Sequence, residues 1–468
     1  MIKTLRSQWA QYGFLLFLVL VFLTGGSSRA ETASLLILRP ASVLLLFWAV
    51  ATTPPDLWRG NRTLLALAFG WAVLTALHLV PLPPAVWQAL PGRELAASID
   101  AAAGLPAMWR PLSLVPWRTL NALFALAVPL AVLVFALRLS REQWSRVVFG
   151  LLALVVASAV LGLLQIIGGT GNPFYTYRVT NPDSGVGLFA NRNHNAVFLS
   201  LGFPFIAATL SLWTAKAEHV RLREWAGAGA GVLLIPFILT TQSRAGILVA
   251  LLSAGLAWWT YRSPAPLAQK RRPRRAIDPR LVFGLIAGVA LVALTLLFTA
   301  TNAVERLARL GQEDDELRWQ IWPPIWRMAL DYLPWGSGIG TFVEVYQVSE
   351  PTGLLQPSYI NHAHNDWLEL FLTGGLPAVA LLLGGLVWLT ARGWRNLRRG
   401  ERQHEAVLRR LGASICAILA LASVYDYPLR TPAMAALLAL AVAMLAGRLR
   451  GEAPTKTART RPDSAVGR

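Results

Sequence analysis

The chain has 468 residues, of which 55% are hydrophobic and only 14% are charged, and its mean hydropathy is positive. These proportions exclude a soluble or disordered chain and indicate an all-α integral membrane protein. A net charge of +19 can indicate a nucleic-acid binder, but here the basic residues follow the loops between apolar runs, so we exclude nucleic acid as a partner.

Apolar runs of roughly bilayer length predict about twelve transmembrane helices. They lie near residues 10–24, 34–52, 63–82, 119–138, 145–168, 194–213, 226–241, 243–261, 280–300, 366–391, 408–426 and 432–449. The first run is alternatively a signal peptide that ends near Ser28-Arg29-Ala30. Both interpretations place residue 30 outside, so the predicted topology of the later helices is the same.

These runs predict four parts of the chain. They are an N-terminal transmembrane bundle of about nine helices at 1–300, a helical outer segment at 301–365, C-terminal transmembrane helices at 366–449, and a disordered cytoplasmic tail at 450–468.

Lysine and arginine are concentrated in alternate loops, as the positive-inside rule expects of cytoplasmic segments. The two most basic loops lie at 262–280 and 392–410, and they place both termini in the cytoplasm. Binding of anionic lipid headgroups is an alternative role for these loops. The predicted outer loops are 25–33, 83–118, 169–193, 241–244, 301–365 and 426–431.

Four basic residues from separate parts of the chain fall at this outer face, namely Arg192, Arg244, Arg318 and His364. Arg244 interrupts an apolar stretch from about 226 to 261, where a charge needs a partner. It either snorkels to the headgroups or binds an anion. We favour an anion, because guanidinium donates two parallel hydrogen bonds to phosphate and stays charged.

The outer segment is predicted to form short helices. Residues 317–322 and 325–330 carry apolar side chains at helical spacing, and Pro323-Pro324 is expected to end or kink the first helix. The Gly-rich turn at 335–340 then permits a tight return toward the membrane.

Metal binding has little support in the sequence, and no cofactor is expected. The acidic run at 313–316 is typical of a solvated helix face, and Cys416 is the only cysteine. His362 and His364 lack an obvious third zinc ligand. A histidine that takes a proton from a sugar hydroxyl is the sharper hypothesis, since imidazole titrates near neutral pH.

The run His364-Asn365-Asp366-Trp367-Leu368-Glu369 before Gly374-Gly375-Leu376-Pro377 resembles the signature of the O-antigen ligase and polymerase superfamily. Further landmarks agree in order: Gly187-Leu188-Phe189-Ala190-Asn191-Arg192-Asn193-His194, Ser243-Arg244-Ala245-Gly246, Arg318-Trp319-Gln320-Ile321-Trp322, and Pro334 to Phe342.

The resemblance implies a multi-pass glycosyltransferase of the bacterial inner membrane. It would move a glycan from an undecaprenyl pyrophosphate carrier to an acceptor hydroxyl at the periplasmic face, with inversion and without a metal. The family's essential arginines match Arg244 and Arg318, and its essential histidine matches His364. Secondary substrate-binding candidates are Arg192, His194, His362, Asn365, Asp366 and Glu369. His362 is a competing base, and Asp366 and Glu369 are expected to orient their neighbours.

The sequence does not identify the acceptor of the glycan. The short outer segment and the lack of a soluble domain after the last span favour a ligase that uses lipid A core. A polymerase that extends a second lipid-linked glycan, for O-antigen or exopolysaccharide, fits nearly as well, and relatives glycosylate proteins. A transporter or flippase for an anionic glycolipid is the alternative of another class. It predicts internal repeats and charges near the membrane midplane, which we do not find in the sequence.

Overall fold

The structure is a computed structural model that describes residues 2–213, 220–263, 318–355, 357, 359–397 and 403–446. In these ranges helices make up most of the chain, and the only strands are β1 (Pro81–Leu82) and β2 (Arg110–Pro111), which pair as a two-stranded antiparallel sheet. The predicted all-α class is therefore confirmed. The ninth predicted span at 280–300, the acidic run at 313–316 and the tail at 450–468 lie outside the described residues.

The helices follow the predicted apolar runs closely. Their bounds are α1 Ile2–Thr24, α2 Leu35–Thr52, α3 Pro55–Gly60, α4 Arg62–Leu77, α5 Pro84–Trp87, α6 Glu94–Ala102, α7 Pro116–Ala125, α8 Ala127–Ala136, α9 Arg141–Ile167, α10 Arg192–Ser200, α11 Gly202–Leu212, α12 Val220–Thr240, α13 Arg244–Thr260, α15 Phe342–Ser349, α16 Asp366–Leu397, α17 Gln403–Tyr425 and α18 Pro432–Ala446, with short 3-10 turns η2 Thr352–Leu354 and η3 Pro428–Arg430. A further helix covers 318–331.

Several of these helices have the dimensions of membrane spans. Seven helical stretches in the described ranges are long and apolar enough to cross a bilayer. Their outer surfaces are apolar: Leu36 is 79% exposed, Phe47 73% and Trp258 88%. Large apolar side chains with this exposure are favourable in contact with lipid tails and unfavourable in contact with water. The chain is thus a multi-pass membrane protein, while the count of twelve spans and the side on which each loop lies stay predictions.

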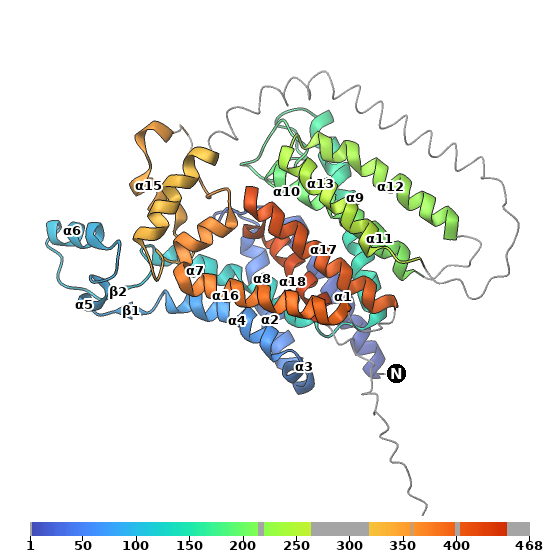
Figure 1. Ribbon diagram of the computed structural model, residues 1–468, viewed down its shortest axis with the longest axis horizontal. Helices are drawn as coiled ribbons and strands as arrows, with labels where there is room; N and C mark the ends of the chain where they lie inside the picture. The colour runs from blue at the N-terminus through green and yellow to red at the C-terminus, as the bar shows by residue number, and fades with distance from the viewer. Residues whose placement is uncertain are drawn as a thin grey trace, which may run out of the picture.

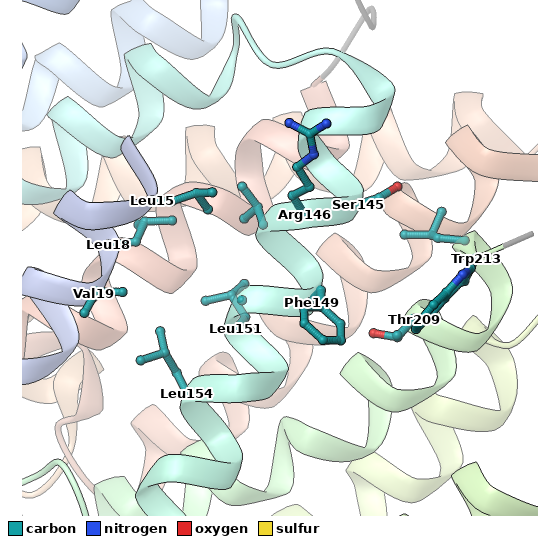
Figure 2. A pocket seen from close by; sticks show the side chains of 13 residues that line it. Leu15, Leu18, Val19, Ser145, Arg146, Phe149, Leu151, Leu154, Thr209 and Trp213 are labelled. Carbon is teal, nitrogen blue, oxygen red and sulfur yellow. The ribbon is translucent and has the colours of Figure 1, made fainter. Parts of the chain in front are cut away.

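A groove of about 580 Å³ between α1, α9 and α11 shows the same lipid-facing character (Figure 2). Leu15, Phe149 and Leu154 form its apolar walls, and Arg146 stands at one end with its Nη1 2.8 Å from Gln11 Oε1. An apolar wall that ends in a cation is the pattern expected where helices meet lipid tails and headgroups.

Several short helices gather at one end of the molecule. Figure 1 shows α5, α6 and α15 together at the end of the long axis opposite to the start of α1. A second apolar core joins helix 318–331 to α15 and α16 there, and it buries Ile321, Ile325 and Phe342. The expectation that Pro323-Pro324 ends the helix is wrong, because this helix continues through both prolines to residue 331. Burial of its apolar face offsets the lost backbone hydrogen bonds.

The span predicted at 366–391 is interrupted. Gly375 has φ 58° and ψ −157°, so α16 consists of a short first piece, a break and a longer second piece. The break is filled by the Gly-rich turn: Ser337 N donates to Leu372 O at 3.1 Å, and Leu376 N donates to Pro334 O at 2.9 Å. A Cβ on Gly375 would lie 2.3 Å from Pro334 O, so only glycine fits.

Two boundaries differ from the prediction for simple local reasons. The helix expected at 63–82 ends at Leu77, because Pro81, Pro83 and Pro84 follow and cannot continue it. The span expected at 226–241 is the end of α12, which begins earlier, at Val220. Neither difference moves a candidate site residue.

Candidate active site

Three histidines from two distant parts of the chain surround one tyrosine ring. The centroid of the Tyr427 ring lies 4.3 Å from that of His362, 5.0 Å from His364 and 5.1 Å from His194. His194 belongs to α10, the other two histidines precede α16, and Tyr427 follows α17. Tyr427 therefore joins the ends of three helices at one point.

On one side of Tyr427 lies a group that we name the Asp426 cluster, formed by Asp426, Asn193, His194 and His364. His364 Nδ1 lies 3.4 Å from Asp426 Oδ1, and His194 Nε2 lies 4.0 Å from the same oxygen. Asn193 Nδ2 donates to Asp426 Oδ2 at 2.7 Å, and the Tyr427 N–H donates to Oδ1 at 2.9 Å. The carboxylate is thus fixed by its neighbours and faces the His364 ring.

The charge state of Asp426 follows from these contacts. Burial raises the pKa of its carboxyl, but the contact with His364, the charges that His194 and His364 carry when they are protonated, and the charge of Arg318 outweigh burial and hold the pKa well below its usual range. Burial, together with the Asp426 charge, raises the pKa of Tyr427 above its ordinary value. The cluster therefore holds an ionised carboxylate beside a neutral phenol at neutral pH.

On the other side of Tyr427 lies the Glu369 cluster, formed by Glu369, His362, Asp366 and Arg430. His362 Nδ1 lies 3.1 Å from both carboxylate oxygens of Glu369. Arg430 binds both acids, with Nη2 3.4 Å from Glu369 Oε1 and Nε 3.0 Å from Asp366 Oδ1. Burial lowers the pKa of Arg430, but the charges of Glu369 and Asp366 outweigh it and raise the pKa above its usual value.

Asp366 and Glu369 also fix the backbone around the site. Asp366 Oδ2 accepts from Ser423 Oγ at 3.0 Å and from Leu429 N at 3.3 Å. Glu369 Oε2 accepts from Ala363 N at 3.0 Å. These bonds hold the segment before α16 against the turn after α17, so the expectation that both acids orient their neighbours agrees with the geometry.

The backbone at His364 is set locally. His364 has φ 50°, a left-handed conformation that is uncommon outside glycine, and it turns the chain sharply into α16. Asn365 follows and begins the helix, with its Oδ1 accepting from Trp367 N and Leu368 N at 3.0 Å each. The Oδ1 of Asn365 thus caps the helix. Trp322 Nε1 donates to Ala363 O at 3.0 Å and connects this turn to the helix that carries Arg318.

The predicted arginines come from three helices, namely helix 318–331, α10 and α13. Arg318 is close enough for its charge to act on the Asp426 carboxyl. Arg192 and Arg244 are the first residues of α10 and α13, which pack together: a Cβ on Gly246 would lie 2.4 Å from Cβ of Ala196. The Arg244 side chain is exposed and those of Arg192 and Arg318 are partly exposed, so all three are accessible to a ligand.

The structure brings together most of the predicted site and adds three residues to it. Asp426, Tyr427 and Arg430 were not predicted, although they hold the two clusters in place. The sequence did carry a signal, because the predicted outer turn at 426–431 contains two charged residues between apolar runs. The topology that selected His364 applies equally to this turn.

Residues 229–383 match the family model described as O-Antigen ligase. None of the curated proteins matches the chain. The matched region contains Arg244, Arg318 and His364, whereas Asp426 and Arg430 lie beyond it. The match agrees with the resemblance found in the sequence motifs and supports a likeness of this region to the O-antigen ligase superfamily.

Proposed function

We propose that the chain transfers a glycan from an undecaprenyl pyrophosphate carrier to an acceptor hydroxyl, with the Asp426 cluster as the catalytic centre. The observation that carries the proposal is the pairing of His364 with an ionised carboxylate, 3.4 Å from Nδ1 to Asp426 Oδ1, beside the charge of Arg318. A base and a cation at one point suit a reaction in which a hydroxyl loses its proton while pyrophosphate leaves.

His364 is the base in this proposal. We assign its Nδ1–H to face Asp426, which leaves Nε2 to accept the proton of the acceptor hydroxyl. As the hydroxyl oxygen bonds to the anomeric carbon, the imidazole becomes positive, and the adjacent carboxylate stabilises that charge. Histidine and aspartate act together in this way in serine hydrolases.

The arginines bind the leaving group. Arg318 and the exposed Arg244 donate to the pyrophosphate oxygens, which take the electron pair as the bond from the anomeric carbon to oxygen breaks. Attack from the opposite face inverts the anomeric centre, and no carboxylate nucleophile is needed. Arg192 at the start of α10 is a further phosphate ligand in this proposal.

His362 is less suited to act as the base. Its Nδ1 lies 3.1 Å from Glu369, whose carboxylate is also bound by Arg430 and the Ala363 N–H. Its side chain is 15% exposed, against 26% for His364. Glu369 is thus already in contact with a fixed cation and gives less stabilisation to a new charge on His362 than Asp426 gives to His364.

We propose lipid A core as the acceptor, with a second lipid-linked glycan as the alternative acceptor of a polymerase. The test uses purified protein, chelator, and a glycan on undecaprenyl pyrophosphate, offered with lipid A core or with a second molecule of the donor. Chelator should leave transfer unchanged. The acceptor that receives glycan distinguishes ligase from polymerase.

The same assay tests the residues. His364→Ala, Arg244→Ala and Arg318→Ala should each lose transfer by about 10²-fold or more. Arg327→Ala is the matched control, because this exposed arginine lies on the helix of Arg318, about two and a half turns further along and so on the opposite side. Near-normal turnover in His364→Ala would exclude it as the base. No transfer with any donor or acceptor would favour a transporter instead.

A further inference from the structure

A polar cavity adjoins the Glu369 cluster. Its volume is about 270 Å³, and its lining includes His362, Glu369 and Arg430. Residues of α2, α4 and α7 also line it. Four arginines line it, Arg29, Arg39, Arg118 and Arg430, against the two carboxylates of Glu31 and Glu369.

Three of these arginines have carboxylate partners. Arg29 Nη1 lies 3.4 Å from Glu31 Oε1, Arg118 Nε lies 2.5 Å from Glu344 Oε1, and Arg430 binds the acids of the Glu369 cluster. Their positions are thus fixed and their charges are matched by carboxylates, which leaves Arg39 as the arginine of this lining with no carboxylate partner among the described residues.

Arg39 is different. Its Nη2 donates to the neutral amide of Asn121 on α7, and its buried Nε has no hydrogen-bond partner among the described residues. Arg39 lies inside α2, about 6 Å along the helix from Leu35. A guanidinium at this depth in an apolar helix is costly unless an anion compensates it. The cavity supplies the space for that anion.

Part of the lining of the same cavity is apolar. Leu35, Trp71, Leu126 and Val128 line it together with the arginines. A site that combines guanidinium groups with apolar side chains fits an anionic group attached to a lipid better than it fits a free small anion. The chemistry of the wall thus selects a lipid phosphate.

We propose that this cavity binds a phosphate of the acceptor lipid, with Arg39 as its main ligand. That this lipid is the acceptor rests on the proposed function, but the binding of a lipid phosphate to the cavity does not. Donor and acceptor then approach Tyr427 from opposite sides: the donor pyrophosphate at Arg244 and Arg318, and the acceptor phosphate at Arg39. Lipid A core and a second undecaprenyl pyrophosphate glycan share this phosphate chemistry.

Binding is measured with the full chain in phosphatidylcholine nanodiscs by native mass spectrometry. The probes are bisphosphorylated lipid A, its dephosphorylated form, and undecaprenyl pyrophosphate. The variants are Arg39→Gln, Arg39→Lys and Arg244→Gln. Arg138→Gln is the matched control, because Arg138 contacts the opposite end of α2 through Thr52.

Arg39→Gln should weaken binding of bisphosphorylated lipid A about tenfold or more and remove its advantage over the dephosphorylated form. Arg39→Lys should restore part of the affinity. Arg244→Gln should instead weaken binding of undecaprenyl pyrophosphate. If the acceptor is a second lipid-linked glycan, the unmodified protein binds two molecules of undecaprenyl pyrophosphate, and Arg39→Gln loses one of them.

Unchanged binding of every probe by Arg39→Gln, or equal weakening of all of them, would overturn the proposal. If Arg39→Gln does not fold, Arg118→Gln should show the same selective loss, and its failure to do so counts equally against the cavity. Selective loss of binding in a protein that transfers no glycan would leave the lipid site standing and reject the proposed function. The two ideas are therefore tested separately.

Discussion

The two clusters beside Tyr427 contain the same kinds of group and differ in how their carboxylates are neutralised. In the Glu369 cluster the acid is bound by His362, by Arg430 and by the Ala363 N–H, and it is 2% exposed. In the Asp426 cluster the acid is bound by neutral donors, Asn193 Nδ2 and the Tyr427 N–H, and faces a more exposed histidine. A fixed cation is present in the first cluster, whereas in the second the positive charge can form on His364 itself.

This difference suggests different roles for the two carboxylates, proton transfer for one and the positioning of neighbouring groups for the other. A carboxylate without a permanent counter-ion in contact stabilises a charge that develops during reaction. A carboxylate already paired with arginine holds its surroundings in place and gains little when a neighbour is protonated. This contrast supports the proposal that proton transfer belongs to the Asp426 cluster and positioning to the Glu369 cluster.

The largest expected effect is that of Asp426→Asn on transfer. The amide no longer stabilises the imidazolium of His364 and presents a donor where an acceptor is needed, so kcat should fall about 10²-fold to 10⁴-fold. The measurement is steady-state transfer together with thermal unfolding in the same detergent. A variant that folds and keeps more than a tenth of the activity would show that Asp426 is not the partner of the base.

Arg430→Met should act mainly on stability. It leaves the buried carboxylates of Asp366 and Glu369 without their cation, which costs about 3–5 kcal/mol in comparable buried pairs. The thermal unfolding midpoint should fall by several degrees. The double variant Asp366→Asn with Arg430→Met should recover part of this loss, because one of the two stranded charges is gone. Equal midpoints for the single variant and the unmodified protein would contradict the positioning role.

Much of this arrangement was predictable from the sequence, and its limits have physical causes. Apolar runs and basic loops located the helices, because burial in lipid requires a nearly unbroken apolar stretch. The break at Gly375 was not predicted, since the run around it is apolar and only its contact with Pro334 explains the kink. The local amino-acid composition does not predict such a contact between distant segments.

For the candidate site, too, the sequence predicted some residues and missed others. His364, Arg244 and Arg318 were selected because the predicted topology puts them at one face and because they match the essential residues of the family that the sequence resembles. Asp426 and Arg430 were not selected, although each is such a partner. The pairings His364 with Asp426 and Asp366 with Arg430 join residues that are far apart in sequence, so their choice depends on packing among helices and not on any local pattern.

The pH dependence of stability sharpens the comparison. The folded pKa of Asp426 is depressed, so its ionised form stabilises the fold above the unfolded pKa of about 3.9. That contribution is lost as the pH falls from there through the folded pKa. The difference in unfolding midpoint between the unmodified protein and Asp426→Asn should be constant from about pH 5 to 8 and shrink below about pH 4. A difference that grows in acid would mean that Asp426 is protonated in the folded protein.

The smallest effect is expected for His362→Gln. The glutamine amide can still donate to Glu369, and Arg430 still neutralises that acid, so the turn before α16 should keep its shape and transfer should fall less than about tenfold. His364→Gln makes the same chemical change beside Asp426 and should remove most activity, because an amide cannot take the hydroxyl proton. If both variants fold and lose activity equally, the two clusters share the proton transfer. The different exposure of the two histidines and the different counter-ions of the two carboxylates would then not separate proton transfer from positioning.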